Sequence, residues 1–228
     1  MSFYYSQILK SGLIVMAADK REATQGIERN TGQINYEYYR DIKKLYITKN
    51  NIGISYAGSK SKKGTPDHIN KYISNIECKT PLETAQFLRT YTLSIDTDVE
   101  IVFSVTGFVD EKPMLYKAST KLPDYYTDEY IAEWKMTFVD RGILLISDQY
   151  SCDPLFDVGS AYPKTATDLI GYHGLAKMKH FNKKDAIQYI LWLAGQCKNS
   201  CDNPDHISEE IDILLIYDDH YEWIGGIK

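Results

Sequence analysis

Ser2, the residue after the initiator methionine, carries two groups that could act together in one reaction. Removal of Met1 would leave Ser2 with both a side-chain hydroxyl and a free α-amine. An α-amine has a pKa of about 8, far below that of a lysine, so it can be substantially neutral at working pH. It could then act as the base for the hydroxyl of its own residue, which would attack a carbonyl carbon. Serine is also a common second residue, so position alone leaves both interpretations open.

Asp19, Lys44 and Gly58 could complete such a site. Asp19 and Gly58 each end a predicted strand. Lys44 lies in a strand of otherwise apolar pattern, where either Lys43 or Lys44 must face inward or lie at a rim. An inward lysine needs a partner, and a strand-end carboxylate such as Asp19 can provide one. The alternative is a lysine that protects an edge strand from aggregation.

Other catalytic motifs are missing from the sequence. There is no Gly-x-Ser-x-Gly, His-Glu-x-x-His or Gly-x-Gly-x-x-Gly motif, and the five histidines form no motif. Cys197, Cys201 and His206 lie close in sequence, but a zinc site needs a further ligand pair that the sequence does not show. We therefore expect neither a metal nor a cofactor.

Composition limits the possible functions. The chain of 228 residues has 43% hydrophobic and 25% charged residues, as is ordinary for a globular protein. Its net charge of -5 gives no electrostatic reason to expect binding to nucleic acid or to an anionic membrane. The longest early apolar run, 13–18, is too short for a membrane span and lacks the features of a signal peptide. We therefore expect a cytoplasmic protein.

Hydrophobic periodicity predicts the elements that would position the candidate residues. Strands are expected over 2–9, 13–19, 40–47, 52–58, 99–109, 113–118, 131–139, 142–147, 211–217 and 221–224. Helices are expected over 67–76, 82–93, 164–171 and 183–197. The stretch 20–33 is polar and is expected to be a connection. Tight turns between strands and helices in consecutive pairs favour a single-domain α+β sandwich over residues 1–228, in which helix pairs cover two antiparallel sheets.

The first quarter of the chain resembles proteasome β-type subunits and bacterial proteasome-like peptidases, which are amino-terminal nucleophile (Ntn) hydrolases. Three pieces carry the resemblance: Gly12-Leu13-Ile14-Val15-Met16-Ala17-Ala18-Asp19-Lys20-Arg21, Ile42-Lys43-Lys44-Leu45 and Ala57-Gly58-Ser59. Later parts of the chain are more loosely similar. Segment 157–161 resembles the step before the family's third helix, 185–187 resembles the start of the next helix, and 210–224 resembles the closing hairpin. The resemblance implies the Ntn-hydrolase fold, a four-layer αββα sandwich.

The resemblance also implies a set of catalytic residues: Ser2, Asp19, Lys44, Gly58, Ser160 and Asp205. The hydroxyl of Ser2 would attack an amide or ester carbonyl, and its α-amine would take and return the proton. Lys44, held by Asp19, would set the local potential. The backbone N–H of Gly58 would stabilise the oxyanion, and Ser160 and Asp205 would orient the amine.

The sequence departs from the family's pattern in several places. The nucleophile is a serine and not the usual threonine. The interval between Asp19 and Lys44 is longer than in the family, which predicts an insertion within 25–39. Ala161 stands where the family has the second glycine of a Gly-Ser-Gly step. Asp202 and Asp205 are both candidates for the aspartate that the family has near the end of its fourth helix.

These features together predict a threonine/serine-type peptidase or amidohydrolase that needs only the removal of Met1 for activation. One alternative is a peptide ligase (transpeptidase), in which an amine and not water resolves the acyl-enzyme. Another is a catalytically silent structural or binding subunit. The expected partners are a peptide or protein substrate, further copies of the chain in a ring or stack, and an unfoldase, with no nucleic acid and no membrane.

Overall fold

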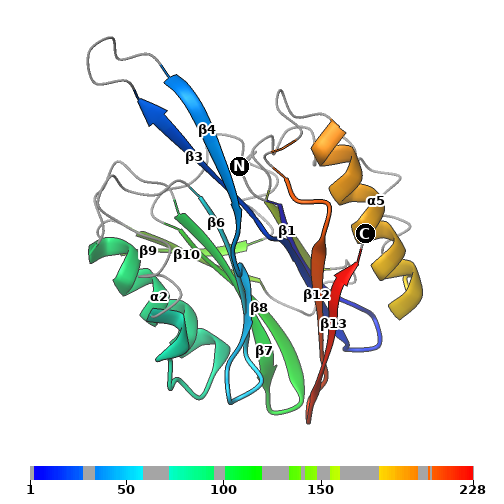
Figure 1. Cartoon of the computed structure of the whole chain (residues 1–228). Coiled ribbons are helices and arrows are strands. Elements are labelled where there is room, and N and C mark those ends of the chain that lie inside the picture. The colour runs from blue at the N-terminus through cyan, green and yellow to red at the C-terminus, as the bar shows by residue number, and fades with distance from the viewer. Residues whose placement is uncertain are drawn as a thin grey trace.

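The computed structural model describes residues 3–27, 34–58, 72–94, 101–119, 134–139, 142–147, 155–159, 180–199, 205 and 207–227. Within these ranges, two antiparallel sheets pack face to face, and helices α2 (Pro81–Ser94) and α5 (Lys183–Asn199) lie on their outer sides (Figure 1). This arrangement is an α+β sandwich. None of the helical segments in the described ranges has the length and hydropathy needed to cross a membrane.

The first sheet has five strands in the order β11-β1-β2-β12-β13. They are β1 (Tyr4–Ile8), β2 (Ile14–Asp19), β11 (Leu155–Gly159), β12 (Ile211–Ile216) and β13 (Tyr221–Ile227). The turn between β1 and β2 contains Gly12 at φ 86°, a left-handed conformation that glycine adopts without a steric penalty. β12 pairs with β2 and places Ile211 opposite Asp19, so the last hairpin of the chain lies beside the first.

The second sheet has six strands in the order β5-β6-β7-β8-β10-β9. They are β5 (Leu45–Ile47), β6 (Gly53–Gly58), β7 (Ile101–Val109), β8 (Lys112–Ser119), β9 (Trp134–Val139) and β10 (Gly142–Ser147). Every neighbouring pair in this sheet is antiparallel. This strand order brings β5, with Lys44 directly before it, to the edge of the sheet.

Three apolar clusters hold the layers together. The cluster between the sheets includes Tyr4, Met16, Leu45, Leu115 and Leu214, each at most 1% exposed. A second cluster joins the outer face of the first sheet to α5, and a third joins the outer face of the second sheet to α2. Strands β1, β2 and β12 are therefore buried on both faces, which explains why β2 and β12 are nearly continuously apolar, while β1 also buries Ser6 and Gln7.

Helices α2 and α5 each begin directly after a residue whose side chain caps the helix. At α2, the Glu83 N–H donates to Thr80 Oγ1 (3.2 Å) and the Thr80 N–H donates to Glu83 Oε2 (3.2 Å), which is a capping box. At α5, the Asp185 N–H donates to Asn182 Oδ1 (3.1 Å). The predicted helix 164–171 and the first half of the predicted helix 67–76, residues 67–71, lie outside the described residues.

The sequence-based prediction misses strands in the stretch after β2 and also at β11 (Leu155–Gly159). The stretch 20–33, expected to be a connection, contains strand β3 (Arg21–Ile27), which pairs with β4 (Ile34–Asp41) in a separate two-stranded sheet. The strand expected over 40–47 is the end of β4 and then β5, with a break at residues 42–44. The β3–β4 hairpin rises from the end of the sandwich (Figure 1), and its described residues 25–27 and 34–39 fall in the range within which an insertion is predicted.

Candidate active site

Asp19 occupies the centre of a buried polar cluster at the end of β2. Its carboxylate is fully buried and accepts three backbone N–H groups: Phe3 to Oδ1 (2.9 Å), Arg21 to Oδ2 (2.9 Å) and Ser208 to Oδ2 (3.4 Å). The Asp19 N–H in turn donates to the Phe3 carbonyl at 3.0 Å. Hydrogen bonds from N–H groups to an ionised oxygen are among the stronger ones in proteins, so the carboxylate is held in one position.

Lys44 reaches the same carboxylate from the second sheet. Its Nζ lies 2.8 Å from Asp19 Oδ1 and also donates to the Arg21 carbonyl, and the side chain is 2% exposed. Burial lowers the pKa of Lys44, the nearby Asp19 carboxylate opposes that fall, and the Arg21 guanidinium adds to it. The pair thus joins the end of β2 to the start of β5.

The neighbouring Lys43 points the other way. Its side chain is exposed, and its Nζ lies 4.8 Å from the ring centre of Tyr46 and 5.5 Å from that of Trp223. The chain between β4 and β5 therefore turns Lys44 and not Lys43 into the interior. Directly after Lys44, Leu45 is completely buried between the sheets.

Phe3 connects this cluster to the start of the chain. The Phe3 nitrogen that donates to Asp19 is the nitrogen of the peptide bond between Ser2 and Phe3. Ser2 itself lies outside the described residues, and so does Ser160. The Phe3 ring is fully buried against the α5 side of the first sheet, which fixes the beginning of β1.

Gly58 and Asp205 lie near this cluster by different routes. The Tyr56 N–H donates to the Lys44 carbonyl at 3.3 Å, and Gly58 follows two residues later in β6. At about 3.4 Å per residue, Gly58 lies about 7 Å further along that strand, at the end of the sheet where Lys44 lies. Asp205 is exposed, and its carbonyl accepts a hydrogen bond from Arg21 Nη1 at 3.4 Å.

Sequence reasoning missed two participants, Ser208 and Asp41. Ser208 is 5% exposed and donates its backbone N–H to Asp19. Asp41, at the end of β4, forms an ion pair with the Arg21 side chain. Both reach the cluster through strand pairings distant in sequence, β12 with β2 and β4 with β3, so local spacing gives no signal for them.

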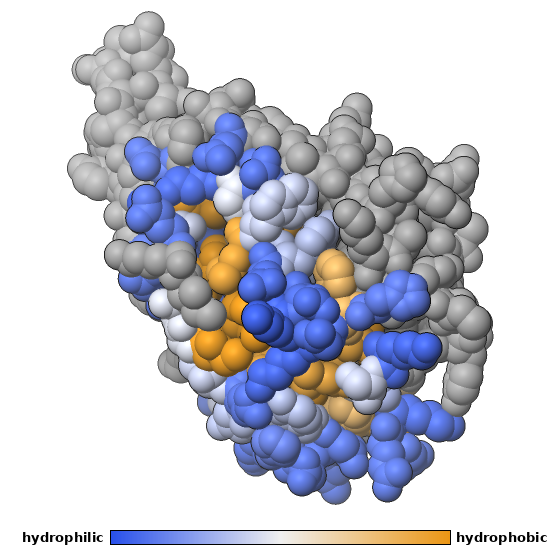
Figure 2. All heavy atoms as spheres, turned by 90° about the vertical axis from the view of Figure 1, so that its right-hand side faces the viewer, coloured by the Kyte–Doolittle hydropathy of each residue, from blue (hydrophilic) through white to orange (hydrophobic). Residues whose placement is uncertain are grey.

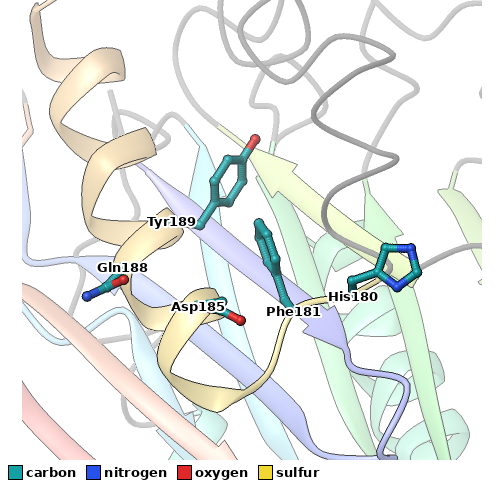
Figure 3. Close-up of a pocket in the computed structure, with 5 residues that line it drawn as sticks. All are labelled: His180, Phe181, Asp185, Gln188 and Tyr189. Carbon is teal, nitrogen blue, oxygen red and sulfur yellow. The ribbon is translucent and has the colours of Figure 1, made fainter.

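An open hollow of about 510 Å³ lies elsewhere, at the start of α5. Its lining consists of His180, Phe181, Asp185, Gln188 and Tyr189 (Figure 3). The nearby Lys183 binds Glu222, close to the turn between β12 and β13. That turn is at the opposite end of β12 from Asp19, so the hollow does not belong to the Lys44 cluster. Across the described ranges, no group of three His, Cys, Asp or Glu residues could hold a metal ion.

Comparisons with known proteins support the fold. No family model matches the sequence, and no curated protein matches it. Among solved structures, the chain is similar to Anbu from Hyphomicrobium sp. strain MC1, with a TM-score of 0.58 and 14% identity over 98% of this chain and 87% of that chain. Anbu is a proteasome-like β-type protein, so the structure supports the proteasome-like resemblance at the level of fold.

Proposed function

We propose that this protein is a proteasome-like Ntn hydrolase that cleaves peptide or amide bonds through an acyl-enzyme on Ser2 after Met1 is removed. The observation that carries the proposal is that one oxygen, Asp19 Oδ1, accepts both the Phe3 N–H (2.9 Å) and the Lys44 ammonium (2.8 Å). Only the peptide bond, about 1.33 Å long, separates the Phe3 nitrogen from the carbonyl carbon of Ser2. The likeness to Anbu supports the fold that this proposal requires.

In the proposed reaction, Ser2 Oγ attacks the carbonyl carbon of the substrate while the α-amine of Ser2 takes the hydroxyl proton. The tetrahedral oxyanion collapses, the C–N bond breaks, and the α-amine returns the proton to the departing nitrogen. The product is an ester on Ser2. Water then attacks this ester by the same steps, with the amine again taking and returning a proton, and releases the acid.

The surrounding residues have distinct roles in this proposal. The charged Lys44, held by Asp19, lowers the pKa of the adjacent α-amine and so increases its neutral fraction. The Gly58 N–H donates to the oxyanion, and one such donor is worth about 10²–10³ in rate. Ser160 and Asp205 orient the amine.

A serine-reactive β-lactone probe and intact-mass measurement test the proposal. The native protein should lack Met1 and gain one probe mass, and Ser2→Ala should gain none. Ser11→Ala is the matched control because Ser11 is an exposed serine of the β1–β2 turn, and it should label like the native protein. Labelling that persists in Ser2→Ala would exclude Ser2 as the nucleophile. Retained Met1 with no labelling would favour the silent-subunit alternative.

The products distinguish hydrolysis from peptide ligation. When a substrate that acylates the native protein is mixed with an added amine nucleophile, the hydrolase releases the free acid as the main product. A main product that is the new amide would favour the ligase alternative.

The same proposal includes a cytoplasmic location, a peptide or protein substrate, assembly with further copies of the chain in a ring or stack, and an unfoldase partner. The side of the molecule that includes α5 and β13 shows apolar side chains among hydrophilic ones (Figure 2). Trp192 on α5 is 46% exposed, which supports a role for this helix in contacts between copies. Sedimentation of the native protein and of Trp192→Glu tests this. The native protein should sediment as an assembly, and the variant should dissociate. A native protein that sediments as a monomer would contradict assembly.

A further inference from the structure

Arg21 binds the candidate site through its backbone. Its N–H donates to Asp19 Oδ2 at 2.9 Å, and its carbonyl accepts the Lys44 ammonium. Any displacement of the first residues of β3 would therefore disturb both members of the buried ion pair.

The Arg21 side chain leads away from that pair. Its Nε lies 3.3 Å from Asp41 Oδ1, and its Nη1 donates to the Asp205 carbonyl at 3.4 Å. The β3–β4 register places Arg21 directly opposite Asp41, at the base of the hairpin. The Ile42 N–H then donates to the Lys20 carbonyl at 2.7 Å, which closes this base and leads the chain to Lys44.

The charges of both Lys44 and Arg21 act at this site, and Lys44 forms the ion pair with the Asp19 carboxylate. The Arg21 guanidinium is paired with Asp41 instead. The Arg21 backbone already contacts Asp19 Oδ2, so a guanidinium released from Asp41 could turn toward the same carboxylate and compete with Lys44 for it.

We propose that Asp41 is a positioning residue of this site: it holds the Arg21 guanidinium at the base of the β3–β4 hairpin and thereby leaves the Asp19 carboxylate to Lys44. This inference rests on the proposed function for its catalytic meaning. The protonation of Lys44, on which Asp41 is inferred to act, can be measured independently of any reaction.

The charges around Lys44 give the sign of the effect. The charged groups that act on it come from the end of β2 (Asp19), the start of β3 (Arg21) and the end of β4 (Asp41). The backbone carbonyl of Asp205, after α5, accepts a hydrogen bond from Arg21, and the neutral N–H of Ser208 donates to Asp19. Loss of the Asp41 charge therefore favours loss of the Lys44 proton, and loss of the Arg21 charge favours its retention.

The titration of Lys44, followed by NMR with ¹³C-labelled lysine side chains, tests the inference. The Lys44 signal is identified by its loss in Lys44→Met. In Asp41→Asn, the midpoint of the Lys44 titration should fall by a few tenths of a pH unit, the size expected for a partly exposed ion pair. In Arg21→Gln it should rise, and in Asp41→Glu it should return to the native value. A general disturbance of the fold would not produce opposite shifts.

Glu77→Gln is the matched control because it removes another exposed ion pair, Lys49 with Glu77, at the other end of β5. It should leave the Lys44 midpoint unchanged. An unchanged midpoint in Asp41→Asn, or shifts of the same sign in Asp41→Asn and Arg21→Gln, would overturn the inference.

Acylation of Ser2 by the β-lactone, measured against pH, gives the second readout. Its alkaline limb should move with the Lys44 midpoint in each variant. If the native protein is not acylated at any pH while the Lys44 midpoints still move as stated, the proposed function fails and the positioning of Lys44 by Asp41 is supported.

Discussion

The residues of the Asp19–Lys44 pair depend on each other unequally. Asp19 accepts three backbone N–H groups besides the ammonium. Lys44, which is 2% exposed, donates to Asp19 and to the Arg21 carbonyl. Removal of the lysine therefore leaves a carboxylate that is still hydrogen-bonded, whereas removal of the carboxylate charge leaves a buried cation without its counterion.

Asp19→Asn should accordingly destabilise the protein by about 3–5 kcal/mol, the usual cost of breaking a buried ion pair from one side. Lys44→Met should cost less, about 1–2 kcal/mol, because its methylene chain still packs and Asp19 keeps its N–H donors. Urea unfolding measures both values. The control Lys49→Met, in an exposed ion pair, should stay within about 0.5 kcal/mol of the native protein. A Lys44→Met that is as costly as Asp19→Asn would contradict this reading of the site.

At the scale of elements, the sequence predicted the parts of the fold that have a buried face. Strands β1, β2 and β12 were predicted as short runs rich in apolar and aromatic residues, and helices α2 and α5 because their apolar residues follow the period of a helix. Strand β3 was missed because its sequence, REATQGI, is mostly polar. The two-stranded sheet to which it belongs is separate from the two main sheets, so the usual apolar signal of a core strand is lacking.

The candidate site was predictable to the same extent. The pairing of Asp19 with Lys44 could be predicted from the sequence, because Asp19 ends a strand and Lys44 interrupts a strand of apolar pattern. Ser208 and Asp41 could not, because they arrive through the long-range pairing of β12 with β2 and through the unforeseen β3–β4 hairpin.

The close approach of the two sheets at β6 gives a prediction at this scale. A Cβ on Gly53 would overlap the buried side chains of Met16 and Ile216, which belong to the facing sheet. Gly53→Ala should therefore destabilise the protein by about 1–3 kcal/mol through overpacking. Gly195→Ala is the matched control, since open space surrounds Gly195 on α5, and it should stabilise the protein by about 0.5–1 kcal/mol. A Gly53→Ala variant as stable as the native protein would mean that the sheets separate more easily than the structure indicates.

At the scale of the whole molecule, buried tyrosines link stability to pH. Burial raises the pKa of Tyr5 well above its ordinary value, raises that of Tyr46, and raises that of Tyr189 to about 12. In the unfolded chain these phenols lose their protons near pH 10. Above that pH the unfolded state binds fewer protons than the folded state, so stability that is complete below about pH 10 is lost as pH rises. The lowered pKa of Lys44 changes stability with pH in the opposite direction, but this is the effect of one group against that of the three tyrosines.

We therefore expect the free energy of unfolding to fall between about pH 10 and about pH 11, with the fully buried Tyr5 contributing a slope of about 1.4 kcal/mol per pH unit. Tyr5→Phe should lose this part of the slope, although it also loses the hydrogen bond to Gln7 at every pH. Tyr221→Phe, at an exposed position, should keep the native slope. Urea titrations at a series of pH values decide the matter, and equal slopes for Tyr5→Phe and the native protein would contradict the prediction.

All the proposed catalytic roles depend on Ser2 being, once it begins the chain, the nucleophile beside Lys44 and Asp19. Its most direct test is tandem mass spectrometry of the amino-terminal peptide, after the protein from its own cells has reacted with the β-lactone. We predict a peptide that begins at Ser2 and carries the acyl group on the serine oxygen, and no such adduct when Lys44→Met is treated in the same way. A peptide that still begins with Met1, or an adduct on any other residue, would contradict the account.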